Sequence, residues 1–326
     1  MDSPVLLRLA NSSGAYIEAL SYGATLVKAV VPDRHGRLEN VLLSYPDAQG
    51  YLADECYLGS TVGRFANRIS GAKFTLNGQT CLLDKNDGEN CNHGGFAGFS
   101  KKMFRYRADA GRLIFAAQSR DGEGGFPGNV NLEVAYSFSD DNELLIAYTL
   151  TSDKTTVVNL TNHAYFNLCP RTRSILSHEL AVNADQRLEF DEHFLPTGKI
   201  LPVANTGFDF SDFRSVGQMM LQKSEPGIKG YNAYFIGKSA GEKGGLPWLA
   251  SLRESESGRL LEVYSTTSGV QLYTGDFLSG AHLPFEGLCL EAQGYPDAPN
   301  HPHFPSCVVE ANQEYRQEIR YRFKVA

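Results

Sequence analysis

The chain has 326 residues, of which 42% are hydrophobic and 21% charged, and its 30 basic and 37 acidic side chains give a formal net charge of −7. This composition is ordinary for a globular protein and excludes a disordered, collagen-like or small disulfide-dense chain. The acidic balance argues against nucleic acid as a partner, because a phosphate backbone requires clustered cations. It also argues against a membrane surface, and no apolar run approaches the ~20 residues of a membrane-spanning helix.

The N-terminus and the cysteines indicate the compartment. Residues 1–4 carry an acid and no basic stretch, so the sequence predicts no signal peptide. The cysteines form no C-x-x-C pair and have no zinc-site spacing. We therefore expect reduced, mostly buried thiols and a cytoplasmic location. The six cysteines are Cys56, Cys81, Cys91, Cys169, Cys289 and Cys307.

Strand-like runs separated by short polar turns dominate the chain. The Asn77-Gly78 pair is a strong turn signal, because both residues tolerate the positive φ angles of a type I′ hairpin. In chain order, the predicted strands and turns are residues 24–31 before a turn at 33–36, 73–76 and 79–83 around Asn77-Gly78, 134–138 and 144–150 around 140–142, and 260–265 and 270–273 around a turn near 268–269.

Helical periodicity is scarce, and only residues 216–222 predict a short helix. Closely spaced strands without intervening helices disfavour a βαβ architecture. No repeat or linker divides the chain. The sequence therefore predicts an all-β protein in which residues 1–326 form one large antiparallel β-sandwich domain.

Three segments mix polar side chains with aromatics and glycines. In residues 63–69, Arg68 offers planar donors to a carboxylate or to hydroxyl oxygens, or it is a surface arginine paired with an acid. His93 lies before Gly94-Gly95, in a loop that a ligand can approach closely. His163 lies in a run of hydrogen-bonding and aromatic residues at 159–167. Either histidine is a functional group or simply a half-buried side chain.

A fourth segment places Glu291 in an apolar strand at residues 287–293. Leu288 and Leu290 face one way there and Glu291 faces the other way. A carboxylate in such a strand is costly unless it is paired or used. Burial raises its pKa and makes it a better base near neutral pH. A buried salt bridge, for example with an arginine, is the alternative.

Other candidate sites lack their structural context. The glycine-rich residues 122–125 are not flanked by a strand and a helix, so they predict no phosphate or dinucleotide loop. His282, His301 and His303 match no standard metal spacing, so we predict no metal site. No G-x-S-x-G segment is present.

Taken together, these segments resemble the aldose 1-epimerases, the galactose mutarotases. The resemblance spans nearly the whole chain, and its segments run in the family's order. They are GRFANRI at 63–69, NHGG at 92–95, GFSKK at 98–102, DGEGGFPG at 121–128, NLTNHAYFNL at 159–168, LPTG at 195–198, FDF at 208–210, QLYTG at 271–275, and CLEAQ at 289–293 with PDA at 296–298.

The resemblance implies the galactose mutarotase-like supersandwich fold and a reaction on free hexoses. It implies that Glu291 is the general base and His163 the general acid of α/β anomer interconversion. It implies no cofactor, since no redox step or group transfer occurs. The residues implied to bind the sugar are Asn67, Arg68, His93, Asn232 and Gln271.

The chain departs from the family pattern at one binding position. Members of the family usually carry an Asp, often followed by His, where this chain has Asn232 and Ala233. An amide still bonds a hydroxyl but lacks the charge that strengthens the bond about twofold. Asp276 stands where an Asn is expected. These changes bear on substrate preference more than on the acid and base.

Three other functions remain as alternatives. A non-catalytic sugar-binding or sensor protein would not require both Glu291 and His163. A hexose-phosphate epimerase would need cations at the far end of the sugar, for which Lys101 and Lys102 are available. A glycoside hydrolase would need a second carboxylate. In each case the predicted partner is a monosaccharide or its derivative, and the protein is a monomer or homodimer.

Overall fold

The computed structural model describes residues 3–222, 229–238 and 245–326. Within these ranges every strand pair of the ladders is antiparallel, and the largest sheet has nine strands. In spatial order they are β10 (Arg105–Asp109), β11 (Arg112–Ser119), β12 (Val130–Phe138), β13 (Glu143–Ser152), β27 (Glu314–Val325), β23 (Arg259–Ser265), β22 (Trp248–Arg253), β17 (Glu179–Val182) and β20 (Arg214–Ser215).

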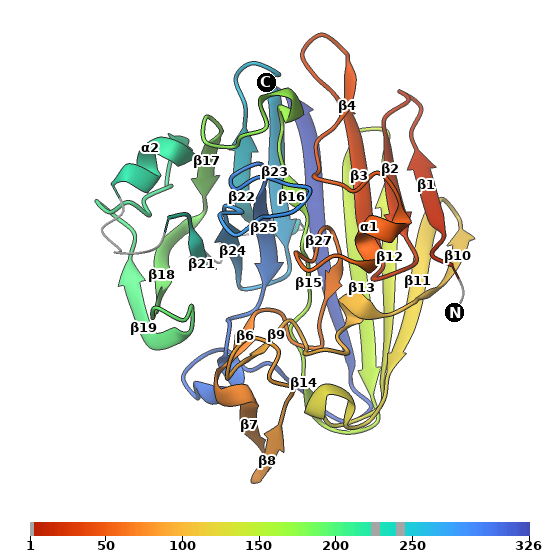
Figure 1. The fold of residues 1–326 in the computed structure, drawn as a ribbon, viewed down its shortest axis with the longest axis vertical. Coiled ribbons are helices and arrows are strands. Elements are labelled where there is room, and N and C mark those ends of the chain that lie inside the picture. The colour runs from red at the N-terminus through yellow and green to blue at the C-terminus, as the bar shows by residue number, and fades with distance from the viewer. Residues whose placement is uncertain (1–2, 223–228, 239–244) are drawn as a thin grey trace.

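A six-stranded and a four-stranded sheet cover this large sheet. The six-stranded sheet runs β16 (Tyr165–Phe166), β25 (Leu288–Gln293), β24 (Gly269–Tyr273), β21 (Asn232–Gly237), β18 (Ala184–Phe190) and β19 (Pro196–Pro202). The four-stranded sheet is β1 (Leu6–Ala10), β2 (Tyr16–Leu20), β3 (Thr25–Pro32) and β4 (Leu38–Asn40). β24 and β25 pack on β22 and β23, and β1 packs on β11 and β12, so the two smaller sheets form one layer of a sandwich (Figure 1).

Short strand pairs and helices complete the described residues. The pairs are β5 (Thr61–Val62) with β15 (Thr161–Asn162), β6 (Arg68–Ile69) with β9 (Cys91–Asn92), β7 (Lys73–Leu76) with β8 (Gln79–Leu82), and β14 (Thr156–Val157) with β26 (Val308–Val309). The α-helices are α1 (Ala48–Leu52) and α2 (Val216–Leu221), and the 3₁₀ turns are Ser70–Ala72, Phe99–Lys101, Glu123–Gly125, Pro170–Thr172 and Ala298–Asn300. No helix in the described ranges has the length and apolarity needed to cross a bilayer.

The main hydrophobic core lies between the two layers. In β13, every second side chain from Leu144 to Leu150 is fully buried, which is the period-two pattern of a strand with one face in a core. The same cluster includes Val263 and Tyr321 from the nine-stranded sheet and Leu272 and Leu290 from the six-stranded sheet. The predicted antiparallel β-sandwich is therefore confirmed.

Most of the predicted local elements are also confirmed. β12 and β13 form the hairpin around 140–142, and β3 pairs with β4 across the turn at 33–36. Asn77 and Gly78 have φ angles of 50° and 77° between β7 and β8, as a type I′ turn requires. The helix α2 begins where predicted, because the Ser215 hydroxyl caps it by accepting the Gln218 N–H.

One predicted hairpin is wrong. Residues 260–265 and 270–273 do not pair with each other. β23 pairs with β22 and β27 in the large sheet, whereas β24 pairs with β21 and β25 in the six-stranded sheet. The connection at 266–268 is therefore a crossing between the two layers of the sandwich, and both flanking strands bury apolar side chains in the core between them.

Candidate active site

The floor of the candidate site is the face of the six-stranded sheet that points away from the core. All six residues of β25 are buried. Leu288, Leu290 and Ala292 belong to the core, so Cys289 and Glu291 must point to the opposite face. Cross-strand pairing places Gln271 opposite Glu291. The strand register thus lines up carboxylate, thiol and amide groups on one surface.

His163 reaches this surface from the link between β15 and β16. Its N–H donates to the Ser60 carbonyl at 3.0 Å, and its carbonyl accepts the Gly59 N–H at 2.9 Å. The imidazole lies beside the rings of Tyr165 and Tyr57, with centroid distances of 5.0 and 5.9 Å. Backbone bonds and ring contacts therefore hold the imidazole in one orientation.

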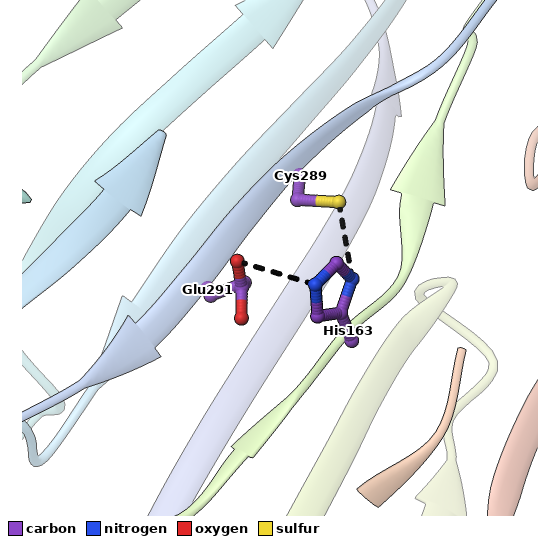
Figure 2. A group of neighbouring side chains, drawn as sticks. All are labelled: His163, Cys289 and Glu291. Atoms are coloured by element: carbon purple, nitrogen blue, oxygen red, sulfur yellow. Dashed lines mark hydrogen bonds and ion pairs between the residues drawn. The ribbon is translucent and has the colours of Figure 1, made fainter. Parts of the chain in front are cut away.

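The two nitrogens of His163 face two residues of β25 (Figure 2). Nε2 lies 3.7 Å from Oε1 of Glu291, and Nδ1 lies 3.4 Å from Sγ of Cys289. The side chains of His163 and Glu291 are only 5% and 3% exposed. Among the described residues, Glu291 therefore lies within ion-pair distance of a histidine and of no arginine.

Burial shifts the two pKa values in opposite directions, because each group loses the water that would solvate its charged form. Burial raises the pKa of Glu291 to about 8, and the positive charge of Arg68 opposes that rise. Burial lowers the pKa of His163 to about 4. Near neutral pH and without a ligand, Glu291 is therefore a protonated carboxyl group and His163 a neutral imidazole. The pair shares one titratable proton, which resides on Glu291.

The loop segments around β6 and β9 form a wall beside this floor. The N–H of His93 donates to the Asn67 carbonyl, and the N–H of Asn67 donates to Nδ1 of His93, both at 3.2 Å. Gly94 permits this arrangement, since a Cβ there would lie 2.1 Å from the Gly63 carbonyl oxygen. Because Nδ1 of His93 accepts a hydrogen bond, its neutral ring carries its proton on Nε2.

His93 is neutral at physiological pH. Burial lowers its pKa well below the ordinary value, and the neighbouring His163 and the charge of Arg68 lower it further. The ring centroids of His93 and His163 are 5.3 Å apart. His93 is therefore a neutral hydrogen-bond donor beside the His163 and Glu291 pair.

Arg68 is paired with an acid and also lines the cavity. Its Nε donates to Oδ2 of Asp87 at 2.7 Å, so it is paired with an acid. The side chain is only 16% exposed, and its guanidinium lies over the ring of Phe194 at 5.3 Å. The acid and the aromatic ring hold the guanidinium at the cavity wall.

These walls enclose a cavity of about 760 Å³. All seven residues singled out as site residues line it: Asn67, Arg68, His93, His163, Asn232, Gln271 and Glu291. Nε2 of Gln271 donates to Oδ1 of Asn232 at 2.6 Å, so these two amides are joined across neighbouring strands. Asp276 is not among the lining residues.

The sequence analysis missed several lining residues. Tyr57, Phe194 and Phe277 contribute aromatic rings, and Asp87 contributes the partner of Arg68. Phe194 and Phe277 contact edge to face with centroids 5.8 Å apart, although 83 residues separate them in the chain. No local pattern marks such residues, because only the folded chain brings them together.

His163, Cys289 and Glu291 are residue types that can bind a metal ion. Their potential ligand atoms lie within 4.8 Å of one another. The donors do not suit one ion, however, because Cys289 lies at Nδ1 of the ring and Glu291 at Nε2. Burial also raises the pKa of the Cys289 thiol well above its ordinary value, whereas a metal ligand must be a thiolate.

Known proteins resemble the chain along its whole length. The aldose 1-epimerase family model matches residues 5–322. Galactose mutarotase from Bos taurus is 39% identical over 95% of this chain and 91% of its own length. Aldose 1-epimerase from Escherichia coli (strain K12) is 34% identical over 98% of this chain and 94% of its own.

Solved structures agree with these sequence matches. An aldose epimerase homologue from C. elegans superposes with a TM-score of 0.93 at 28% identity, over 99% of each chain. Galactose 1-epimerase from Lactobacillus acidophilus superposes with a TM-score of 0.86 at 27% identity, also over 99% of each chain. The chain belongs to the aldose 1-epimerase family.

Proposed function

We propose that this protein is a mutarotase that interconverts the α and β anomers of free aldohexoses such as galactose and glucose. The observation that carries the proposal is the 3.7 Å separation of Glu291 and His163 in the cavity. Both oxygens that exchange protons in this reaction are bonded to C1 of the sugar. An acid and a base must therefore lie side by side, and these two residues do.

The chemistry requires one proton to leave and one to arrive. Glu291, as carboxylate, removes the proton of the C1 hydroxyl while His163 protonates the ring oxygen. The bond from C1 to the ring oxygen breaks, and the open-chain aldehyde rotates about its C1–C2 bond. Closure on the other face reverses both proton transfers. Each transfer of this kind contributes roughly 10²- to 10⁴-fold to a rate.

The protonation of the pair suits this cycle. The reactive form has a carboxylate and an imidazolium, and it differs from the resting form only by one proton moved from Glu291 to His163. The positive charge of Arg68 favours the carboxylate, because it lowers the pKa of Glu291. No oxidation-state change or group transfer occurs, so we propose that no cofactor takes part.

We assign sugar binding to Asn67, Arg68, His93, Asn232 and Gln271. Among the described residues, Oε1 of Gln271 and Oε2 of Glu291 are buried acceptors that lack a hydrogen-bond partner. Unpaired buried oxygens are costly, and sugar hydroxyls are donors that would satisfy them. Arg68 and the Nε2–H of His93 supply donors to the sugar oxygens.

The charge of the cavity disfavours a phosphorylated sugar. Among the described lining residues Arg68 is the one arginine or lysine, and it is paired with Asp87, whereas Glu55, Glu89 and Glu192 add negative charge. Lys101 and Lys102, the cations available in the sequence, bond to the Asp54 carbonyl and to Glu123 instead. A free aldose therefore suits the cavity better than its phosphate.

We also propose that residues 1–326 form one domain, that the protein is cytoplasmic, and that it is a monomer or homodimer. The family match across residues 5–322 supports the first point. The six unpaired cysteines support a reducing compartment.

Polarimetry tests the function directly. Purified protein should accelerate the change in optical rotation of freshly dissolved α-D-galactose and α-D-glucose, and rates across galactose, glucose, xylose and arabinose would rank the substrates. Sugar binding without acceleration would instead indicate a non-catalytic sensor. Acceleration confined to hexose 6-phosphates would contradict the argument from the cavity's charge.

A further inference from the structure

Cys289 contacts His163 but has no part in the reaction described above. Its side chain is fully buried on β25, between β24 and β16. Tyr273 and Tyr165 are its cross-strand neighbours on the two sides. The sulfur therefore cannot move away from Nδ1 of His163, 3.4 Å distant, without disturbing its packing against these two strands.

Every side of the His163 ring has a defined neighbour. Tyr165 and Tyr57 lie beside its faces, Glu291 lies at Nε2, and Cys289 lies at Nδ1. A thiol is both a weak donor and a weak acceptor. The sulfur of Cys289 can thus accept a hydrogen bond from Nδ1–H of His163. The position of the proton matters, because in a neutral imidazole only the nitrogen without a proton can act as a base.

We infer that Cys289 is a positioning residue whose sulfur accepts the Nδ1–H of His163 throughout the reaction, so that Nε2 alone gives and takes the moving proton. The inference rests on the proposed mutarotase function. In the imidazolium both nitrogens bear protons, and loss of the Nε2 proton to the ring oxygen leaves the Nδ1–H tautomer. That tautomer can take the proton back at Nε2 during closure without any rearrangement.

The choice of sulfur has a chemical consequence. A carboxylate at Nδ1 would stabilise the imidazolium and weaken it as an acid. The ring oxygen of a sugar is a poor base, so its protonation favours a strong acid. A neutral sulfur orients the ring without that stabilisation, in keeping with the low pKa of about 4 for His163.

The first test compares Cys289→Ala and Cys289→Ser with Cys169→Ala, which removes another fully buried thiol outside the cavity. We expect kcat of Cys289→Ala to fall about 10- to 100-fold with KM within twofold, since small losses of orientation have effects of this size. Cys289→Ser retains an acceptor and should recover part of the loss. Cys169→Ala should match the wild type, and His163→Ala should lose more than Cys289→Ala.

The second test reads the tautomer itself. Nitrogen-15 NMR of histidine-labelled protein at pH 7 should show His163 neutral with its proton on Nδ1. In Cys289→Ala the population should move toward Nε2–H, which can donate to the unprotonated oxygen of the Glu291 carboxyl group. Cys169→Ala should leave the spectrum unchanged.

Two results would overturn the inference. One is an Nε2–H tautomer in the wild type. The other is a Cys289→Ala variant with wild-type kcat, or with a change in KM alone, which would indicate a packing role. A wild-type protein without anomerase activity would end the proposed function, but the tautomer spectra would still decide whether Cys289 holds Nδ1.

Discussion

The nine-stranded and six-stranded sheets use the same strand alternation for different purposes. In β13 of the large sheet, fully buried side chains alternate with partly exposed ones. In β25 of the smaller sheet, both faces are buried, one against the core and the other beneath the loops that carry Asn67, His93 and His163. A sheet face covered by loops buries polar groups, and there burial raises the pKa of Glu291 and lowers that of His163.

Glu291→Gln should have the largest effect, a loss of activity without a loss of stability, because Glu291 lies on the cavity face of β25. The amide keeps the shape of the side chain but cannot act as a base, so we expect kcat to fall about 10³-fold or more, within the range for general acid–base catalysis. Polarimetry measures the rate, and circular dichroism with a denaturation curve checks the fold. A variant with near-normal rate would remove the base assignment.

Leu290→Ala tests the opposite face of the same strand. Leu290 is 1% exposed in the core, and truncating such a side chain typically lowers the free energy of unfolding by about 2–5 kcal/mol. The kcat of the folded protein should stay within about threefold. Urea denaturation and polarimetry together measure both effects. A loss of kcat as large as that of Glu291→Gln, without loss of stability, would show that the faces are not independent.

The pH dependence of kcat/KM should report the pKa values of His163 and Glu291, which lie on the loop-covered face of the six-stranded sheet. Below about pH 4 both groups are protonated and no base remains, whereas above about pH 8 neither is protonated and no acid remains. We therefore expect a plateau between these limits. Rates measured in a series of buffers would contradict the assignment if they fell tenfold across pH 5 to 7.

The free energy of unfolding should also depend on pH through Glu291 and His163. The raised pKa of Glu291 means that the folded chain keeps a proton that the unfolded chain releases above its ordinary pKa of 4.5, so stability falls as pH rises toward 8. His163 opposes this trend only between about pH 4 and its ordinary value of 6.5. Between pH 6.5 and 8 the wild type should therefore lose unfolding free energy relative to Glu291→Gln.

Asn232→Asp should have the smallest effect, and it tests whether Asn232 contacts the sugar. Aspartate can still accept the Gln271 hydrogen bond, and it offers a charged oxygen to a sugar hydroxyl. We expect KM for galactose to fall a few-fold and kcat to stay within twofold. An unchanged or higher KM in polarimetric progress curves would mean that Asn232 does not contact the sugar.

Much of the site could be predicted from sequence, because its residues lie in segments whose composition and order resemble a family. Glu291 was recognisable as a carboxylate in an apolar strand, and His163 lies 3.7 Å from it. Cys289 and Tyr57 gave no comparable signal, since their contacts with His163 arise only when separate segments pack together. The pairing of β23 and β24 was mispredicted for a related reason: a short link does not reveal whether it joins neighbours in a sheet or crosses between sheets.

The assembly of the cavity from remote segments has a kinetic consequence. Asn67 and His93 come from the first third of the chain, His163 from its middle and Glu291 from near its end. Contacts of such long sequence separation form slowly, because much chain entropy must be lost before they are made. Recovered turnover after dilution from denaturant should therefore lag behind the recovery of strand signal and mark the completion of folding.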